Sequence, residues 1–240
     1  MAIWFALIVV AYLFASVPVA YLVAKWVRGI DLGQYGTGQM GGGNLWRMTS
    51  WKLGLAVGLF DFSKGWGMVW VAQALGLDIA QQIVVGIAAI IGHNWSVFMR
   101  FNGGRGVATA IGVVLILPFI NDMTPWPTVA FATILAGGVV ITHRSALPMF
   151  LASVVLPIVS CFYEPVTVTL AFLAIFLIII TKRLTVPLSA EAASVGRGQL
   201  FLNRLLLDRD IRDRHAWLYR VPPEANSANQ SSREEKTKEG

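Results

Sequence analysis

Apolar residues along the chain form long runs, and polar connections separate these runs. Seven runs approach the roughly 20 apolar residues that a helix needs to cross a bilayer. They cover residues 2–24, 53–76, 80–98, 107–120, 125–142, 146–163 and 165–181. This pattern predicts an all-α integral membrane protein with about seven transmembrane helices.

Two of the runs differ from a plain membrane anchor. The run at 107–120 is short and directly follows NGGRG (102–106), so we expect it to start below the surface or to line a cleft. The run at 53–76 contains Asp61 and Lys64, which share one helix face and are costly inside a membrane. Such a pair forms either a buried ion pair that joins helices or part of a functional site.

The composition and the charge pattern support a membrane protein over a nucleic-acid-binding protein. Only 13% of the residues are charged, against about 25% in soluble domains. Lys and Arg gather in alternate connections, whereas the connections that hold Asp78, Asp122 and Glu164 have none. The positive-inside rule therefore predicts an N-terminus outside the membrane and a C-terminus in the cytoplasm. The first apolar run is expected to be a retained transmembrane helix rather than a signal peptide. No nucleic-acid partner is expected.

The glycine-rich segment GTGQMGGGNLWR (36–47) fits the G-x-G-x-x-G pattern of dinucleotide sites. That fingerprint requires a strand before the glycines and a helix after them within a βαβ unit. Here apolar runs flank the segment on both sides, so we exclude a dinucleotide site. Flexible glycine backbone followed by Arg47 instead suits phosphate, because backbone N–H groups and a guanidinium both bind this anion.

Two further connections on the same predicted side have similar chemistry. Residues 92–109 contain a glycine pair, Arg105 and the start of a short helix, and residues 143–145 read His-Arg-Ser. Glycine-rich turns and helix N-termini favour anions. Three loops on one face therefore predict a phosphorylated substrate at the inner membrane surface.

These segments together resemble the motifs of a known family. Residues 36–47 resemble the G-S-G-N-x-G-A-T-N-x-x-R motif of the bacterial acyl-phosphate-dependent glycerol-3-phosphate acyltransferases. DFSKG (61–65) is similar to the family's D-x-x-K-G, and residues 92–109 are similar to its G-H-x-x-x-x-F-x-x-F-x-G-G-K-G-V-A-T block. The motifs occur in the family's order between about residues 16 and 181, so the chain is identified as a divergent member.

The resemblance implies an enzyme of the bacterial cytoplasmic membrane whose active site faces the cytoplasm. Such an enzyme transfers a fatty acyl group from acyl phosphate to glycerol 3-phosphate, giving lysophosphatidic acid and phosphate in phospholipid synthesis. It implies no cofactor and no metal, and we expect a monomer surrounded by membrane lipid.

Matching positions in the motifs imply roles for individual residues. His93 would lie near the attacking hydroxyl, although a lone histidine is also compatible with a structural role, and His93 and Lys64 are the expected catalytic residues. Asn44 and Arg47 would hold glycerol 3-phosphate. The acyl-phosphate head group would be held by Thr37, Gly38, Lys64, Gly103, Gly104, Arg105 and Ser145.

The chain also departs from the family pattern. Gly42-Gly43 replace Ala-Thr, and Arg105 replaces lysine. The family's third motif, H-R-x-N-I-x-R-L-x-x-G-x-E, corresponds to TKRLTVPLSAE (181–191), where only Arg183 and, less clearly, Glu191 match. The alternatives are therefore a catalytically altered or inactive paralogue that binds a phosphorylated lipid or uses a different acceptor, and a transporter built around Asp61 and Lys64.

Three regions follow from the sequence. Residues 1–188 form the predicted transmembrane domain, 189–221 a basic cytoplasmic extension and 222–240 a disordered tail. Within the extension, 199–220 mixes leucine with arginine and aromatics, which suits an amphipathic helix on anionic lipid, an ordinary soluble helix or a partly ordered tail. Candidates to replace the missing third motif are Arg204, Arg209 and His215.

Overall fold

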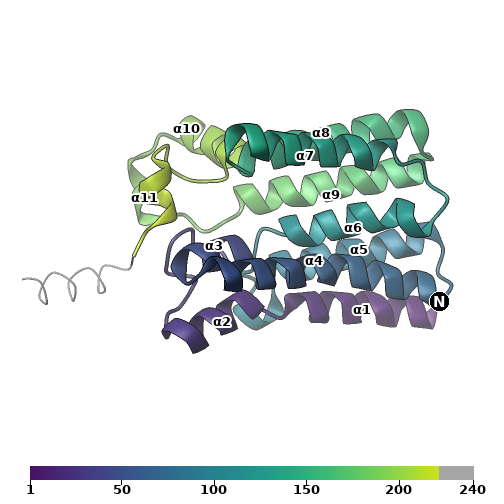
Figure 1. Ribbon diagram of the computed structural model, residues 1–240, viewed down its shortest axis with the longest axis horizontal. Helices are drawn as coiled ribbons and strands as arrows, with labels where there is room; N and C mark the ends of the chain where they lie inside the picture. The colour runs from purple at the N-terminus through teal and green to yellow at the C-terminus, as the bar shows by residue number, and fades with distance from the viewer. Residues whose placement is uncertain (222–240) are drawn as a thin grey trace, which may run out of the picture.

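The computed structural model describes residues 1–221, and this part of the chain is helical without strands. Long helices run side by side through the body of the molecule (Figure 1). They are α1 (Ala2–Ser16), α4 (Trp51–Ala74), α5 (Ile79–Asn94), α6 (Val107–Ile120), α7 (Trp126–Thr142), α8 (Ala146–Tyr163) and α9 (Val166–Leu184). Each predicted apolar run is thus helical, which confirms the all-α class. The predicted disordered tail, 222–240, lies outside the described residues.

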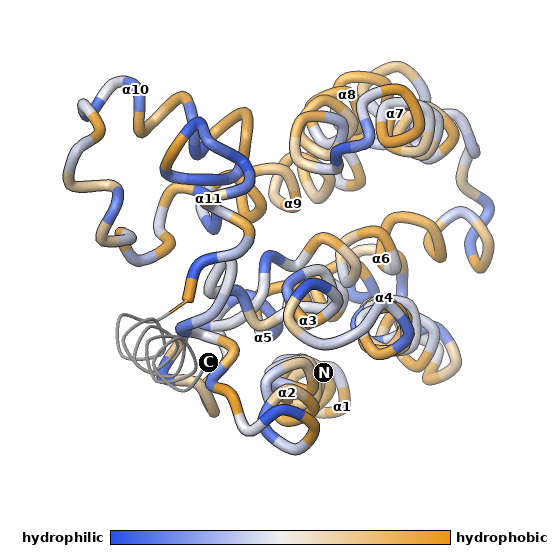
Figure 2. The backbone as a smooth tube through the Cα atoms, turned by 60° about the vertical axis from the view of Figure 1, so that its left-hand side comes forward, coloured by the Kyte–Doolittle hydropathy of each residue, from blue (hydrophilic) through white to orange (hydrophobic). Residues whose placement is uncertain are grey.

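Short helices gather at one end of this bundle, opposite the N-terminus (Figure 1). They are α2 (Val19–Arg28), α3 (Gly42–Met48), α10 (Arg197–Leu202) and α11 (Arg214–Leu218), with 3₁₀ turns at Val97–Met99 and Ala190–Ser194 and a π-turn at Asn203–Leu207. Hydrophobic residues dominate the long helices, and hydrophilic residues concentrate around α10 and α11 (Figure 2). The basic connections predicted to share one side therefore lie at this end.

Four helical segments are long and apolar enough to cross a membrane: Ala2–Arg28, Ile79–Met99, α8 and α9. The helices α6 and α7 are apolar but shorter. Helix α4 is long, but Asp61 and Lys64 lie within it. Length and composition alone therefore support a membrane protein with at least these candidate spans.

The first predicted run, 2–24, is interrupted at Val17-Pro18, between α1 and α2. Proline has no backbone N–H, and its ring clashes with the preceding helical turn, so the helix ends there. The Nζ of Lys64 donates to the Val17 carbonyl oxygen at 2.9 Å. A charged side chain from α4 thus satisfies a carbonyl group at this break.

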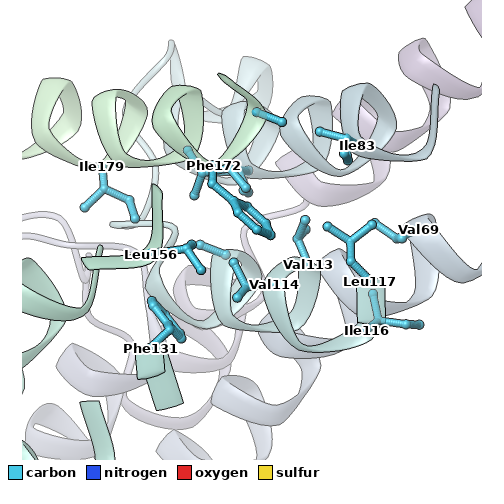
Figure 3. Packing of buried hydrophobic residues seen from close by; sticks show 14 of the residues in the cluster. Val69, Ile83, Val113, Val114, Ile116, Leu117, Phe131, Leu156, Phe172 and Ile179 are labelled. Carbon is cyan, nitrogen blue, oxygen red and sulfur yellow. The ribbon is translucent and has the colours of Figure 1, made fainter. Parts of the chain in front are cut away.

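Helix α6 lies at the centre of the main hydrophobic core (Figure 3). Its residues Val113, Val114, Ile116 and Leu117 are fully buried, against side chains from α4, α5, α7, α8 and α9. The α4 and α6 backbones approach closely, and a Cβ on Gly112 would collide with the Phe62 carbonyl. The short predicted run is therefore enclosed largely by protein, which explains how it can be shorter than a full span.

The extension does not form one amphipathic helix over 199–220. It consists of α10, the π-turn, an irregular stretch and α11. The chain reverses at Asp208, which has a left-handed backbone (φ 57°), and the Asn203 side chain donates to the Asp210 carbonyl oxygen at 3.0 Å. Local bonds and packing against α8 and α9 therefore replace the continuous amphipathic helix that was one of the alternatives from the sequence.

Candidate active site

A cleft of about 610 Å³ opens at the end of the bundle where the short helices gather. Its walls come from the glycine-rich loop and α3, the first turns of α4 and α6, the turn between α7 and α8, and the extension. The volume is within the usual range for small-molecule sites, about 300–1,000 Å³. The polar and charged lining residues are Thr37, Gln39, Asn44, Arg47, Asp61, His93, Arg105, Thr142, Arg144, Ser145, Asp208, Arg209 and Arg214.

The three loops that the sequence predicted to share one face do meet around this cleft. Thr37 and Arg47 come from the first loop, Arg105 from the second and Ser145 from the third. The alternation of basic and acidic connections predicted their common side, and the packing of α3, α6 and α8 brings them to one cavity.

A buried polar cluster forms the floor of the cleft. The Oδ1 of Asp61 accepts a hydrogen bond from Lys64 Nζ at 2.9 Å and lies 3.5 Å from His93 Nδ1. Thr109 Oγ1 donates to the Asp61 backbone carbonyl at 2.9 Å. Asp61 and His93 line the cleft, whereas Lys64 lies behind Asp61 with 1% of its surface exposed. Direct contact between Lys64 and a substrate head group therefore stays a prediction.

The glycine pair before α6 packs directly on His93. The N–H groups of Gly103 and Gly104 donate to the carbonyl oxygens of Asn94 (3.1 Å) and His93 (3.0 Å). A Cβ on Gly104 would collide with His93 Nε2. The two glycines thus permit a close approach that positions the imidazole, and their N–H groups are engaged by the end of α5 rather than directed at the cleft.

Asn44 organises the glycine-rich loop from its centre. Its side-chain oxygen accepts from the Thr37 N–H at 3.1 Å, and its Nδ2 lies within 2.9–3.3 Å of the carbonyl oxygens of Leu32, Tyr35 and Gln39. Asn44 is 3% exposed. Its amide therefore fixes the loop that presents Thr37, while the backbone N–H of Gly38 donates to the Tyr35 carbonyl and Gly38 does not line the cleft.

Arg47 lies one helical turn after Asn44 and is only partly buried. Its guanidinium donates to the Gly43 carbonyl at 2.7 Å and lines the cleft. Burial lowers the pKa of Arg47, and the positive charge of nearby Arg214 also lowers it. Arg47 therefore belongs to a locally cationic wall.

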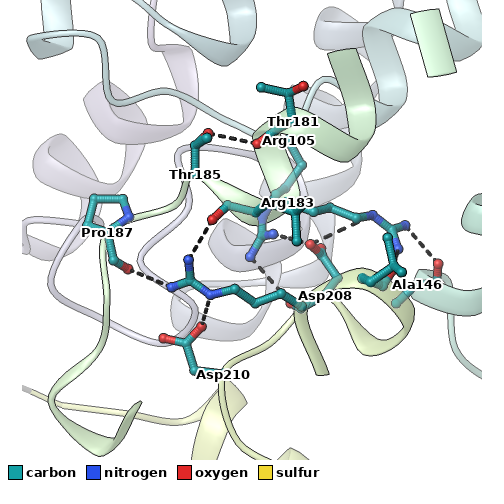
Figure 4. A network of polar contacts seen from close by, with 11 residues as sticks. Arg105, Ala146, Thr181, Arg183, Thr185, Pro187, Asp208 and Asp210 are labelled. Carbon is teal, nitrogen blue, oxygen red and sulfur yellow. Dashed lines mark hydrogen bonds and ion pairs between the residues drawn. The ribbon is translucent and has the colours of Figure 1, made fainter. Parts of the chain in front are cut away.

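Arg105 is held by the extension in this structure (Figure 4). It forms an ion pair with the Asp208 carboxylate, and its second terminal nitrogen donates to the Asp208 carbonyl at 3.3 Å. Arg183, which was matched to the third motif from the sequence, lies 3.9 Å from the same carboxylate. It also donates to the carbonyl oxygens of Leu205 (2.7 Å) and Ala146 (2.8 Å). These contacts join α6, α8 and α9 to the extension.

Sequence reasoning missed that the extension forms a wall of the cleft. Asp208, Arg209 and Arg214 line it, together with the apolar Leu207, Trp217 and Leu218. Of the three candidates to replace the third motif, only Arg209 lines the cleft. Arg204 is bonded to Asp210 and to backbone carbonyls, and His215 lies elsewhere. The basic composition of 204–220 was the only signal in the sequence.

Within residues 1–221, no group of three or more His, Cys, Asp or Glu side chains is arranged to hold a metal ion. The ionisable groups that line the cleft are its arginines, His93 and two carboxylates.

Comparisons with known proteins agree with this site. The sequence model of the family described as "Glycerol-3-phosphate acyltransferase" matches residues 5–186. Glycerol-3-phosphate acyltransferase 5 of Dehalococcoides mccartyi strain 195 is 43% identical over 220 residues, covering 88% of this chain and 91% of the relative. A Glycerol-3-phosphate acyltransferase of Thermus thermophilus is 43% identical over 126 residues, covering 52% of this chain and 62% of the relative.

Two crystal structures share the fold. Both are of PlsY (YgiH), an integral membrane glycerol 3-phosphate acyltransferase, and are 27% identical in sequence to this chain. The glycerol 3-phosphate form has a TM-score of 0.69, covering 88% of this chain and 95% of PlsY. The lysophosphatidic acid form has a TM-score of 0.66, with coverages of 87% and 94%. The chain therefore belongs to the glycerol-3-phosphate acyltransferase family.

Proposed function

We propose that this protein transfers a fatty acyl group from acyl phosphate to the 1-hydroxyl of glycerol 3-phosphate in phospholipid synthesis. The observation that carries the proposal is the charge of the cleft, where arginines outnumber carboxylates beside a buried histidine. Two phosphate-bearing substrates would balance this excess. The arginines are Arg47, Arg105, Arg144, Arg209 and Arg214, and the carboxylates are Asp61 and Asp208.

The chemistry needs little from the protein beyond positioning and charge, because an acyl phosphate already carries a good leaving group. The oxygen of the glycerol 3-phosphate hydroxyl attacks the acyl carbonyl carbon. The bond between that carbon and the phosphate oxygen breaks, and phosphate leaves with the bonding electrons. The hydroxyl proton passes to His93, and the products are lysophosphatidic acid and inorganic phosphate.

The contacts of His93 fit the role of base. Asp61 lies on its Nδ1 side, which leaves Nε2 to accept a proton. Gly104 packs against the Nε2 edge of the ring, where a Cβ would collide, and so holds the imidazole in position. Lys64 holds Asp61 in place and offsets its charge. In this proposal Lys64 and Asp61 act through His93.

The remaining predicted residues divide between the two substrates. Arg47 binds the phosphate of glycerol 3-phosphate, and Asn44 fixes the loop that carries it. Arg105 binds the acyl phosphate after exchanging the Asp208 carboxylate for the phosphate, while Thr37 and Ser145 complete that side of the cleft. Gly38, Gly103 and Gly104 shape the backbone around these groups.

The acyl chain would enter from the lipid along apolar residues of the same cleft. Leu55 and Leu59 on α4 line it and are 48% and 61% exposed, and Ile111 on α6 lies beside them. We place the protein in the bacterial cytoplasmic membrane as a monomer with seven spans, an outside N-terminus and the cleft facing the cytoplasm. The concentration of hydrophilic residues at the cleft end supports this orientation (Figures 1 and 2).

The proposal is tested with purified protein, acyl phosphate and glycerol 3-phosphate, by following phosphate release and lysophosphatidic acid. The control is His93→Asn, because asparagine keeps a donor near Asp61 and lacks a nitrogen at the Nε2 position. We expect the variant to lose about 10²–10⁴-fold in rate. Wild-type protein that releases no more phosphate than this variant would contradict the proposal. Binding of lysophosphatidic acid without turnover would instead support the catalytically altered paralogue.

A further inference from the structure

The C-terminal segment, residues 203–220, brings two arginines into the cleft from outside the family match, which ends at residue 186. Arg209 follows the π-turn, and Arg214 starts α11. Arg209 is 9% exposed, and its Nε is buried without a hydrogen-bond partner among the described residues. Leaving a buried guanidinium nitrogen without a partner is unfavourable, and an anion in the cleft would supply one.

The carboxylates near Arg209 have other partners. Asp208, the preceding residue, pairs with Arg105. Asp213 accepts hydrogen bonds from the N–H groups of His215 (2.8 Å) and Ala216 (3.1 Å) at the start of α11. Asp210, the following residue, pairs with Arg204. The cations close to Arg209 are Arg144 and Arg214.

Arg144 and Arg214 surround Arg209 with positive charge. Burial is the largest cause that lowers the pKa of Arg209, and the positive charges of Arg144 and Arg214 lower this pKa further. The negative charge of Asp213 acts in the opposite direction. Arg214 in turn lies close enough to Arg47 to lower the pKa of that residue. All four arginines line the same cleft, and such a concentration of guanidinium groups suits a phosphate dianion with three acceptor oxygens.

The C-terminal segment is fixed in position by bonds that do not involve these two arginines. The N–H of Gly36 donates to the Arg220 carbonyl, and Arg220 Nε donates to the Gly36 carbonyl, each at 2.8 Å. A terminal nitrogen of Arg204 donates to the Leu184 carbonyl at the end of α9 at 2.8 Å. The segment is thus attached on both sides of Arg209 and Arg214, so their place in the cleft wall is set before a ligand binds.

We propose that Arg209 and Arg214 bind the phosphate of glycerol 3-phosphate together with Arg47 and Arg144. This inference rests on the proposed function and adds acceptor-binding residues to it. The acceptor is favoured over acyl phosphate because Arg214 lies beside Arg47, whereas the donor side is marked by Arg105 and its bond to Asp208. The added arginines supply positive charge near the place where the chain departs from the third family motif.

The inference is tested on the full-length protein with Arg209→Gln and Arg214→Gln. The matched control is Arg212→Gln, because Arg212 lies in the same segment, is exposed and does not line the cleft. We measure KM for each substrate and, without turnover, the rise in melting temperature caused by glycerol 3-phosphate. We expect the KM for glycerol 3-phosphate to rise about tenfold or more in both variants, consistent with the loss of a charge-assisted contact. The KM for acyl phosphate should change less than about twofold in both variants, and so should both KM values of Arg212→Gln.

The melting temperature separates binding from a structural role. Arg209→Gln should melt at or above the wild-type temperature without ligand, because it relieves like-charge repulsion, and glycerol 3-phosphate should stabilise it less. If both variants behave like Arg212→Gln, or if only the KM for acyl phosphate rises, the inference is wrong. Because ligand-induced stabilisation needs no turnover, an inactive wild-type protein would overturn the proposed reaction while this binding comparison still gives its own answer.

Discussion

Two sets of arginines lie around the same cleft and differ in what their guanidinium groups contact. The guanidinium groups of one set form ion pairs with carboxylates and hydrogen bonds to backbone carbonyls; this set consists of Arg105, Arg183 and Arg204. The other set forms no ion pair with a carboxylate in the described part of the chain, and it consists of Arg47, Arg144, Arg209 and Arg214.

The difference shows that arginine has two roles in this protein. One set stabilises the fold around the cleft, and the other is available to bind an anion. Paired arginines satisfy buried acceptors and fix the extension against α8 and α9, so removing one leaves buried groups without partners. The arginines without a carboxylate partner repel one another and make few hydrogen bonds to the described part of the protein, so they contribute little to stability until an anion binds. Substitutions in the first set should therefore affect folding, and substitutions in the second should affect affinity.

The largest effect is expected from Arg204→Gln, in the paired set. Arg204 and Asp210 are both buried, and breaking such a pair costs about 3–5 kcal/mol because one charge remains uncompensated. Hydrogen exchange should show loss of protection across 203–220. Adding Asp210→Asn to this variant should restore much of the protection. Unchanged exchange in the single variant would remove Arg204 from the paired set.

A smaller effect of a different kind is expected from Arg47→Gln. Within residues 1–221 Arg47 donates only to the Gly43 carbonyl, and it lines the cleft, so its loss should leave the melting temperature nearly unchanged. The KM for glycerol 3-phosphate should rise about tenfold, which corresponds to about 1.4 kcal/mol of binding free energy. A fall in melting temperature with no change in this KM would place Arg47 with the structural arginines.

Low pH should destabilise the extension by protonating the carboxylate that pairs with Arg204. Burial tends to raise the pKa of Asp210, but hydrogen bonds from Arg204 and the Ser189 N–H outweigh it and lower the pKa below its usual value. A lowered folded-state pKa means that the ionised carboxylate contributes stability above its unfolded pKa of about 3.9. That contribution is lost as pH falls through the lower folded value. The protection factors of the amides in 203–220, which correct for the pH dependence of intrinsic exchange, should stay constant from neutral pH to about pH 4 and fall below it, and Asp210→Asn should lack this acid step.

The smallest effect is expected from Glu191→Gln. Glu191 lies 3.3 Å from Arg220 and is 44% exposed at its side chain. Exposed pairs contribute about 0–1 kcal/mol, so both the melting temperature and the kinetics should remain close to those of the wild type. A large fall in kcat would instead give Glu191 the catalytic importance expected of the third family motif.

The sequence determined the helices and the composition of the loops between them. A run such as 146–163 can satisfy its backbone in an apolar environment only as a helix, because each hydrogen bond then forms within a few residues. The alternation of basic and acidic connections then gave the side on which residues 36–47, 92–109 and 143–145 meet. These properties depend on residues that are close together in the sequence, so they can be predicted from the sequence alone.

Only the tertiary structure decided which polar groups remain available to a ligand. Asn44, Gly103 and Gly104 matched the family motifs, yet their amide groups are bonded to the protein's own backbone. Arg105 is paired with Asp208, and Arg209, which only composition suggested, is buried without a partner for its Nε among the described residues. The physical reason is that the state of a guanidinium depends on atoms within about 4 Å, and in this protein those atoms come from segments about a hundred residues apart.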